Sequence, residues 1–594
     1  MNPTVIKERV GKLLFATAGA LSVVAVISIF AFLFSRGLPA ISRIGLDDFL
    51  FGSIWAPDRS DTFEGAVLGS YGILPMIAGT GAVTLGALLF GGIAGIFTAV
   101  FLVYFCPSHH RERFASVIHL LAGIPSVVYG FFGIVFLLPL LARIAPNNGS
   151  GLLAASMILG LMILPTVVSL SRTALEAVPE SYHNASMALG ATRTETIFRV
   201  ALPAARSGIT ASLILGIGRA LGETMAVVMV AGNAPIFPKG LFRSFRVMTA
   251  NIVMEMGYAG DLQEGALVAT GVVLLVFVLI VNLIFGHISQ GAMCRATKPK
   301  NRRRGKKLLA LSPRFAKSIP IAGRFLAYFF GFSTVVSLLF ILGFLCIKGL
   351  PPLLSDAHLI FGRFEFGGRR ITLLPAIVTT LMVLLLSISL AIPIGVMSAI
   401  FLHEYAKPKH PIVRILRLSI GILGGVPSIV YGLFGMIAFL PIFGGTSSIL
   451  AGSLTISMML LPTVVRATEE SLSAVDDGLR AGSFALGAGK LRTVWRIVLP
   501  SAAPGILSAV ILSMGRVISE SAPFLYTTGS VISALPRSYL DSGATLAVAL
   551  YQLSGEGWYF DEAYAAAVLL ILLILIFNTL AQKLSAKLLR RAQT

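Results

Sequence analysis

Long apolar runs are the feature of this 594-residue sequence that most constrains its fold. Segments 13–34 and 265–288 are each longer than twenty residues and carry no Lys, Arg, Asp or Glu. A strand in a protein core needs only about five or six residues, whereas a helix that crosses a bilayer needs roughly 20 apolar residues. The sequence therefore predicts an all-α, polytopic membrane protein.

The composition and charge exclude other classes. The chain is 56% hydrophobic and 12% charged, whereas about a quarter of the residues in soluble proteins are charged. The net charge of +21 would suggest nucleic-acid binding in a soluble protein. Here the basic residues flank apolar runs, as in the cytoplasmic loops of membrane proteins, and are not interleaved with aromatic residues that would stack on bases. We expect membrane lipid as a partner, and no nucleic acid.

The apolar runs divide the chain into two parts of similar length. At about 20 residues per span, the sequence predicts 12 transmembrane helices, six in each half. The first six lie at 12–36, 70–104, 115–141, 151–171, 206–231 and 265–288, and the second six at 323–349, 371–403, 413–441, 446–465, 504–527 and 561–583. We therefore expect a first half over 1–294, a linker over 295–320 and a second half over 321–594.

The linker predicts the orientation in the membrane. Residues 295–317 carry ten Lys and Arg and no acidic residue, so this segment is expected on the cytoplasmic side. A basic segment that binds anionic lipid would lie on the same side. With six spans before the linker and six after it, both termini are also expected to be cytoplasmic.

An internal repeat relates the two halves. One offset of 297 connects three pairs of segments: 165–168 with 462–465, 188–191 with 485–488, and 218–219 with 515–516. Shared membrane composition would not keep a single offset through charged and turn residues. Because each half has an even number of predicted spans, the halves have the same orientation, related by an axis along the membrane normal. The sequence predicts two parallel six-helix repeats.

Each half carries a charge pair inside its fifth predicted span. Arg219 and Glu223, like Arg516 and Glu520, are four residues apart and are expected on one helix face. A central charge in a bilayer costs about 2.5–3.5 kcal/mol. A structural salt bridge is one explanation, but apolar residues of similar volume would often stabilise the bundle as well. Guanidinium groups bind tetrahedral oxyanions through paired hydrogen bonds. We favour an anion pathway, with the glutamates as resting partners of the arginines.

The polar segments 172–205 and 466–502 follow the fourth span of each half. Gly190 and Gly487 can end a short helix in the left-handed conformation, and a Leu-Pro pair follows each glycine. The pattern predicts a short helix across the cytoplasmic face. Two ordinary loops are the alternative, but the same turn chemistry in both repeats favours a docking surface.

These segments resemble the EAA motif of ABC importer permeases, which forms the coupling helix inserted into the ATPase subunits. The first three motif positions are Asn184-Ala185-Ser186 and Ala481-Gly482-Ser483, so Asn184 and Ala481 replace the initial glutamate. The resemblance implies that six residues couple the chain to ATPase subunits: Ala185, Ser186, Gly190, Gly482, Ser483 and Gly487.

The segments around the two charge pairs make the resemblance more specific. GRALGETMAV at 218–227, with PSVVYG at 125–130, looks like the C-type permease of phosphate-specific ABC importers. GRVISESAPFLYTTG at 515–529, with PSIVYG at 427–432, looks like its A-type partner. The resemblance implies a fused permease with the type I importer fold, and it places the four charged residues in the translocation path: Arg219, Glu223, Arg516 and Glu520.

The same resemblance implies partners and a location. Phosphate would be imported across the bacterial inner membrane, with an external phosphate-binding protein and two cytoplasmic ATPase subunits that bind ATP and Mg. The outer loop 37–69 would contribute to docking of the binding protein. The sequence holds no G-x-x-x-x-G-K-[ST] loop, so the ATPase is expected in another chain. We identify no catalytic or metal-ligating arrangement and expect a non-catalytic subunit.

Other functions are compatible with the same sequence features. Sulfate, molybdate or phosphonate are other oxyanions that the same pathway could carry. An ion-coupled secondary anion transporter also has two six-span halves, but it has no ATPase to dock at the coupling segments. A membrane receptor or scaffold would leave the buried arginines without an explanation.

Overall fold

The computed structural model of the chain describes residues 3–63, 66–145, 147–297, 313–362, 371–406, 413–414, 417, 420, 424–532, 534–557 and 559–593. Most of the basic linker lies outside the described residues. This part of the chain is mostly helical, and its sheet is an antiparallel hairpin in which Trp55 pairs with Tyr71. The strands are β1 (Trp55–Phe63) and β2 (Ala66–Tyr71).

The described residues of the first half form fifteen α-helices, with short π or 3-10 segments between them. The α-helices are α1 (Pro3–Ile44), α2 (Leu46–Phe51), α3 (Leu74–Ala87), α4 (Ile93–Val100), α5 (Ser108–Ala122), α6 (Ser126–Phe132), α7 (Leu138–Leu141), α8 (Leu152–Glu176), α9 (Glu180–Ala188), α10 (Arg193–Thr196), α11 (Leu202–Ala204), α12 (Arg206–Gly222), α13 (Met225–Val230), α14 (Met248–Glu255) and α15 (Asp261–Thr297). The short segments are η1 (Leu88–Gly92), η2 (Phe101–Phe105), η3 (Gly133–Leu137), η4 (Asn147–Gly149), η5 (Ile197–Ala201) and η6 (Met256–Tyr258).

The second half repeats this order. Its described α-helices are α16 (Pro313–Ser355), α17 (His358–Phe361), α18 (Leu374–Ile400), α20 (Ser428–Phe439), α21 (Ile449–Ser473), α22 (Asp477–Ala485), α23 (Lys490–Thr493), α24 (Leu499–Ser519), α25 (Ala522–Thr527), α26 (Leu546–Glu556) and α27 (Phe560–Gln593). The short segments are η7 (Phe401–Tyr405), η8 (Leu440–Phe443) and η9 (Val494–Val498). As the repeat predicts, α8 packs on α3 and α12, and α21 packs on α18 and α24.

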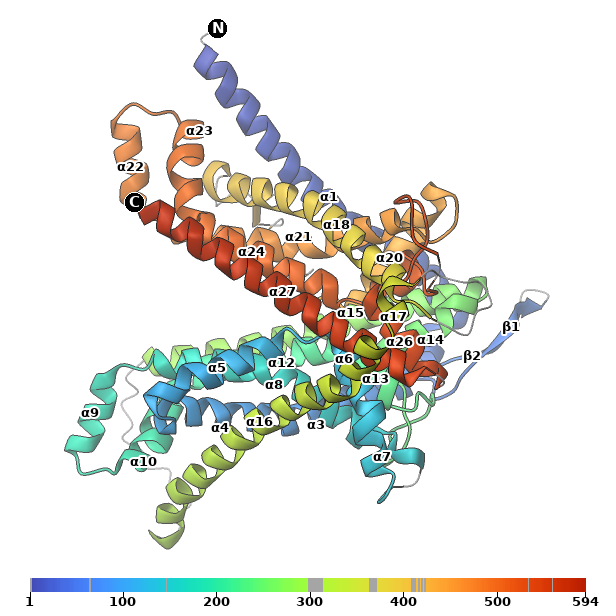
Figure 1. Cartoon of the computed structure of the whole chain (residues 1–594), viewed down its shortest axis with the longest axis horizontal. Coiled ribbons are helices and arrows are strands. Elements are labelled where there is room, and N and C mark those ends of the chain that lie inside the picture. Colours follow the sequence, from blue (N-terminus) through green and yellow to red (C-terminus); the bar gives the residue numbers. More distant parts are fainter. Residues whose placement is uncertain are drawn as a thin grey trace.

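The two halves form two bundles that exchange their first helices. In Figure 1, α1 runs with the upper bundle and α16 with the lower one. A buried hydroxyl pair stands at each crossing: Ser22 Oγ lies 2.8 Å from Ser398 Oγ, and Thr334 Oγ1 lies 2.9 Å from Thr98 Oγ1. Such hydroxyl contacts hold helices together where the surroundings are apolar. The exchange therefore interlocks the halves.

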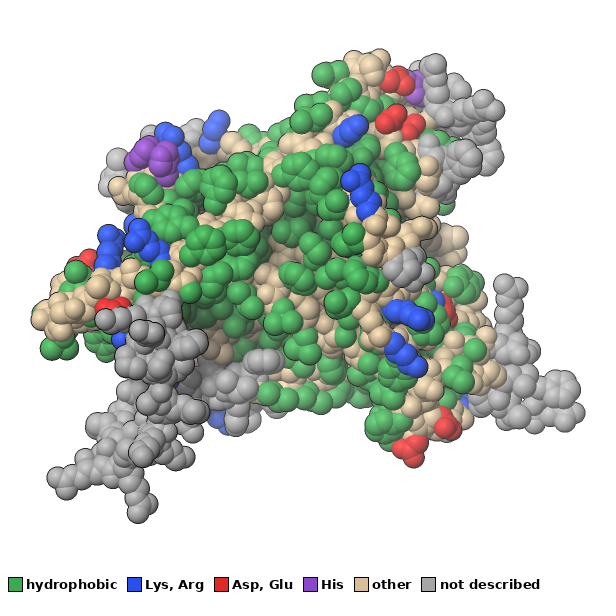
Figure 2. All heavy atoms as spheres, turned by 90° about the horizontal axis from the view of Figure 1, so that it is seen from below, with side chains coloured by type: hydrophobic (Ala, Val, Ile, Leu, Met, Phe, Trp, Pro, Cys, Tyr) green, Lys and Arg blue, Asp and Glu red, His purple; other side chains and the backbone are tan. Residues whose placement is uncertain are grey.

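The molecule has two distinct ends. The hairpin of β1 and β2 lies at one, and α9 and α22 lie at the other (Figure 1). Both chain termini lie toward the α9/α22 end. Hydrophobic side chains cover the middle of the face in Figure 2, and Lys and Arg side chains lie toward both the α9 side and the opposite side. An apolar middle with charged ends is the surface expected of a membrane protein.

The number of spans differs from the prediction. In the described residues nine helices are long and apolar enough to cross a membrane, and a tenth is counted if two segments, 193–204 and 206–222, bent by 66°, form one span. The third predicted span of each half is wrong as a single helix. The helix of the first half breaks before Pro125, and α20 begins after Pro427. Proline has no N–H and disfavours helix in the preceding residue, which hydrophobicity alone does not register.

Candidate functional site

A central cavity of about 860 Å³ lies between the two halves. Its walls come from α12 and α15 of the first half, from α21, α24 and α27 of the second, and from the chain breaks before α6 and α20. All four charged residues of the predicted pathway line it: Arg219, Glu223, Arg516 and Glu520. The structure therefore brings together residues that are about 300 positions apart in the sequence.

Helical periodicity explains why the arginines face this cavity. Along α12, the lining residues recur at 214–215, 218–219 and 222, and along α24 they recur at 511–512, 515–516 and 519. This spacing of three to four residues is one face of a helix. Gly218 and Gly515 leave room beside each arginine: a Cβ there would lie about 4 Å from the Oδ1 atoms of Asn282 and Asn578, respectively.

Each cavity helix ends immediately before its glutamate. Glu223 (φ −75°, ψ 135°) and Glu520 (φ −75°, ψ 141°) are extended residues. The prediction that arginine and glutamate share one helix face is therefore wrong, because α12 ends at Gly222 and α24 ends at Ser519. The arginines stand in the last helical turn, where the helix dipole favours a cation.

Threonine and serine hydroxyls hold the charged groups in the same way in both halves. Arg219 donates to Thr166 Oγ1 at 3.0 Å, and Arg516 donates to Thr463 Oγ1 at 3.3 Å. The first residues of α6 and α20, Ser126 and Ser428, hydrogen-bond the carboxylates of Glu223 and Glu520. Each charge therefore has a neutral hydrogen-bond partner within its own half.

The two charge pairs differ in contact. Arg516 Nε lies 3.5 Å from Glu520 Oε1, whereas the described residues contain no ion pair between Arg219 and Glu223. Electrostatic interactions also cross between the halves, from Arg219 and Glu223 to Glu520. The four groups thus form one cluster, in which an incoming anion would compete with carboxylates for the guanidinium groups.

Several polar residues of the cavity are not predicted by the sequence patterns. Asn282, Asn578 and Gln582 line it, and their signal was a polar side chain within an apolar span. Arg466 on α21 also lines it. Apolar length does not indicate this residue, because it ends the predicted fourth span at residue 465. The offset of 297 pairs Arg466 with Ser169, so the third cation of the cavity belongs to the second half alone.

The predicted short helices before the cavity helices are α9 and α22. Gly190 (φ 84°) and Gly487 (φ 79°) are left-handed after these helices, as the sequence predicts. The neighbouring Leu189 and Leu486 are 89% and 91% exposed. Exposed leucines at the tips of both helices indicate an interaction surface.

The six predicted coupling residues occupy two sides of α9 and α22. Ala185 and Gly482 are exposed, together with the two glycines that follow these helices. Ser186 Oγ lies 2.9 Å from Thr196 Oγ1, and Ser483 Oγ lies 2.9 Å from Thr493 Oγ1. The two serines therefore fasten each helix to the segment that returns to the membrane.

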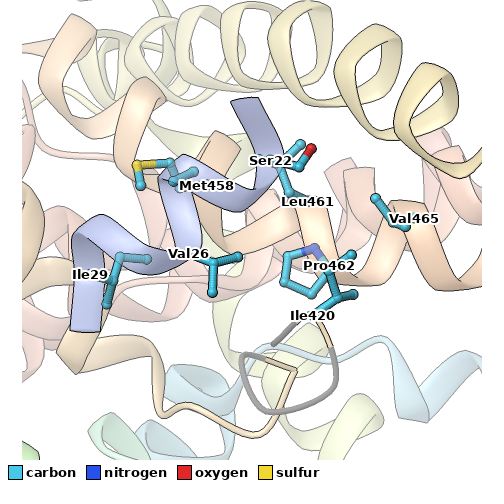
Figure 3. Close-up of a pocket in the computed structure, with 9 residues that line it drawn as sticks. Ser22, Val26, Ile29, Ile420, Met458, Leu461, Pro462 and Val465 are labelled. Carbon is cyan, nitrogen blue, oxygen red and sulfur yellow. The ribbon is translucent and has the colours of Figure 1, made fainter. Parts of the chain in front are cut away.

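A second, smaller crevice lies between α1 and α21. Figure 3 shows Val26 of α1 near Pro462 of α21, with Ile29 farther along α1. Its volume of about 10 Å³ is the space of about one water molecule. It is too small and too apolar for an anion, so the central cavity is the candidate pathway.

Two interlocked helical bundles around a polar cavity define a membrane transport protein. Residues 91–293 and 391–591 each match the family of the binding-protein-dependent transport system inner membrane component. One match falls in each half. The chain belongs to this family, and it is an ABC importer permease with both membrane repeats in one polypeptide.

Relatives of known name are similar over much of the chain. The phosphate transport system permease protein PstA homolog of Mycoplasma pneumoniae is 30% identical over 532 residues, covering 79% of this chain and 79% of that protein. The phosphate transport system permease protein PstC of Mesorhizobium japonicum is 34% identical, covering 42% of this chain and 80% of that protein. An inward-facing MetNI methionine ABC transporter structure is 19% identical, with a TM-score of 0.31, covering 36% of this chain and 95% of that one.

Proposed function

We propose that this chain forms the membrane pathway of an ATP-driven importer of inorganic phosphate. The observation that carries the proposal is the shared cavity in which Arg219 and Arg516 approach from the two halves. Two guanidinium groups can bind a tetrahedral oxyanion through paired hydrogen bonds. The names of the two relatives, a PstA homolog and a PstC, favour phosphate among such anions.

The carboxylates supply the resting state of this pathway. In the proposed mechanism, Glu223 and Glu520 balance the arginines while the cavity holds no anion. Phosphate replaces the carboxylates as the guanidinium partner, and leaves when the glutamates return. Serine and threonine hydroxyls keep the charged groups in place during this exchange. The carboxylates therefore offset two of the three arginine charges of the cavity until the anion takes their place.

The two ends of the molecule have different partners in this proposal. Two ATPase subunits, which bind ATP and Mg, dock on the exposed tips of α9 and α22. This end and both termini face the cytoplasm of a bacterium, and the chain lies in the inner membrane. A phosphate-binding protein docks at the hairpin end, where loop 37–69 contributes α2 and most of the hairpin.

Phosphate uptake into proteoliposomes tests the proposal. The chain is reconstituted with the candidate ATPase subunits, with ATP inside and the binding protein outside, and radiolabelled phosphate is followed. We expect accumulation that requires ATP and both partners. Excess unlabelled sulfate, molybdate or phosphonate should leave it unchanged.

Two results would assign another function. Competition by one of these oxyanions at the level of unlabelled phosphate would reassign the substrate. Uptake that needs no ATPase and stops when ionophores collapse the ion gradients would identify a secondary anion transporter.

A further inference from the structure

Helix α14 differs in polarity from α26, its counterpart in the second half. Both begin with a backbone N–H donating to a threonine of the second span: Met248 N to Thr80 Oγ1 at 3.1 Å, and Leu546 N to Thr380 Oγ1 at 2.8 Å. This alignment pairs each polar residue of α14 with an apolar one: Thr249 with Ala547, Asn251 with Ala549, and Glu255 with Leu553. Because α26 occupies the same place with apolar residues, the fold does not require the polar ones.

Three polar side chains from outside α14 converge on the buried carboxylate of Glu255, the last residue of this helix. The Glu255 side chain is 10% exposed and forms an ion pair with Arg246. Its Oε2 atom also accepts from Trp55 Nε1 at 2.7 Å and from Gln263 Nε2 at 2.8 Å. The counterpart of Arg246 in the second half is Ala544. A buried charge with this many partners is rigidly held, since losing any partner leaves a desolvated polar group.

Trp55 connects this network to the hairpin. It is the first residue of β1, it is buried, and its ring meets the edge of Tyr71 at a centroid distance of 5.8 Å. Gly52 and Gly72 approach so closely below the strands that a Cβ on Gly72 would lie 2.3 Å from the Gly52 carbonyl carbon. The base of the hairpin is therefore fixed relative to α14.

The other contacts of α14 reach the cavity wall and the second half. Thr249 Oγ1 donates to the backbone oxygen of Glu223 at 3.1 Å. Tyr526 of α25 donates to the backbone oxygens of Ile252 at 3.1 Å and Val253 at 2.7 Å. One eight-residue helix thus touches the hairpin network, a pathway glutamate and the opposite half.

We propose that α14 closes the hairpin end of the cavity and that Trp55, Arg246 and Glu255 are positioning residues that hold it closed. When an extracytoplasmic binding protein docks, it acts on the hairpin, and the hairpin transmits this contact to α14, which is then released. Only this last step, the identity of the partner, rests on the proposed function.

Access of a thiol reagent to the cavity tests the closure directly. Cys106, Cys294 and Cys346 are replaced by alanine, and Leu512→Cys on the cavity wall serves as the reporter. A membrane-impermeant thiol reagent is added from the hairpin side of the full chain in vesicles.

Two variants disrupt the network of Trp55, Arg246 and Glu255 in different ways. Arg246→Ala with Glu255→Leu copies the apolar solution of the second half, and Trp55→Phe removes one N–H donor while keeping an aromatic ring. We expect each to label at least tenfold faster than the parent from the hairpin side. Met254→Leu, on α14 but outside the network, is the matched control and should label at the parent rate. Labelling from the α9/α22 side should be equal in all four proteins.

The outcomes separate this inference from the proposed function. Labelling needs neither phosphate nor ATPase, so it remains readable if no phosphate is transported. Unchanged labelling of Trp55→Phe from the hairpin side would show that the network does not hold α14 closed, even if the double variant fails to fold. Faster labelling from both sides would indicate a general loss of packing in the variant. That result would also refute closure of the cavity by α14. If both variants label as expected but adding the binding protein to the parent leaves its labelling unchanged, the binding protein does not release α14 through the hairpin.

Discussion

The two halves share an architecture but not a set of polar contacts. Both present an arginine at the end of a broken helix and fasten it to a threonine. The first half alone has the buried Arg246–Glu255 pair near the hairpin, and the second half alone has Arg466 in the cavity. The comparison teaches that the duplicated arginines line one shared cavity, whereas Arg466 and the Arg246–Glu255 pair make the two halves different.

The largest expected effect comes from the duplicated arginines. Arg219→Ala and Arg516→Ala should each reduce phosphate uptake at least tenfold, because one charge-assisted hydrogen bond contributes about 1.5–3 kcal/mol. Uptake in proteoliposomes measures this, with chromatography to confirm assembly. The matched lysine variants keep the charge but lose the planar fork, and should recover part of the activity. Normal uptake in both alanine variants would refute the anion pathway.

The next effect is expected at the left-handed glycines. Replacing Gly190 and Gly487 by leucine forces a left-handed conformation that costs roughly 1–2 kcal/mol per residue, and it deforms both helix tips. ATP hydrolysis by the docked ATPase subunits should continue while transport falls severalfold. Gly343→Ala is the matched control, since this helical glycine has no atom within 4 Å of an added Cβ. Hydrolysis and transport that remain tightly coupled would exclude a coupling role for the tips.

A moderate effect is expected from Arg466, the cavity cation that has no basic counterpart in the first half. Arg466→Ser gives the second half the residue of the first, and phosphate uptake should fall about threefold to tenfold, a loss of one screened charge interaction. Adding Ser169→Arg to this variant moves the cation to the first half. Part of the uptake should return if the charge of the cavity matters more than the position of the arginine. Initial uptake rates against phosphate concentration measure both variants. An unchanged rate in Arg466→Ser would mean that the two halves differ here without consequence.

The smallest effect is expected where the halves are most alike. Ser22→Ala and Thr334→Val each remove one hydroxyl pair between an exchanged helix and the opposite bundle. Interhelical hydrogen bonds in membranes average about 0.6 kcal/mol, so each variant should lower the free energy of unfolding by about that amount. Denaturation in mixed micelles measures the change. A large loss in only one variant would show that the crossings are not equivalent.

Much of this organisation was readable from one-dimensional patterns. Apolar length predicted a membrane protein, and a single offset through Pro165, Arg219 and Gly190 predicted the duplication. The positive φ angles of both glycines confirm the predicted helix ends. These features are local, since each depends on the chemistry of a residue and its immediate neighbours.

Other features were not readable because they depend on contacts between distant segments. Hydrophobicity predicted the third and fifth spans as continuous, but breaks precede Pro125 and follow Gly222. Arg466 looked like a loop residue because its cavity exists only when α21 meets the opposite half. Trp55 carried no signal, since a tryptophan within an outer loop predicts no partner two hundred residues away.

The sequence by itself determined the class of the chain, a membrane protein of two parallel repeats, and predicted an arginine inside a span of each repeat. Only the tertiary structure decided that the two arginines share one cavity, that the first helices are exchanged, and that a buried ion pair connects the hairpin to α14. The reason is physical: transfer of apolar residues into lipid is close to a sum over single segments. Charge clusters and hydrogen bonds depend instead on which segments the fold brings within a few ångströms of each other.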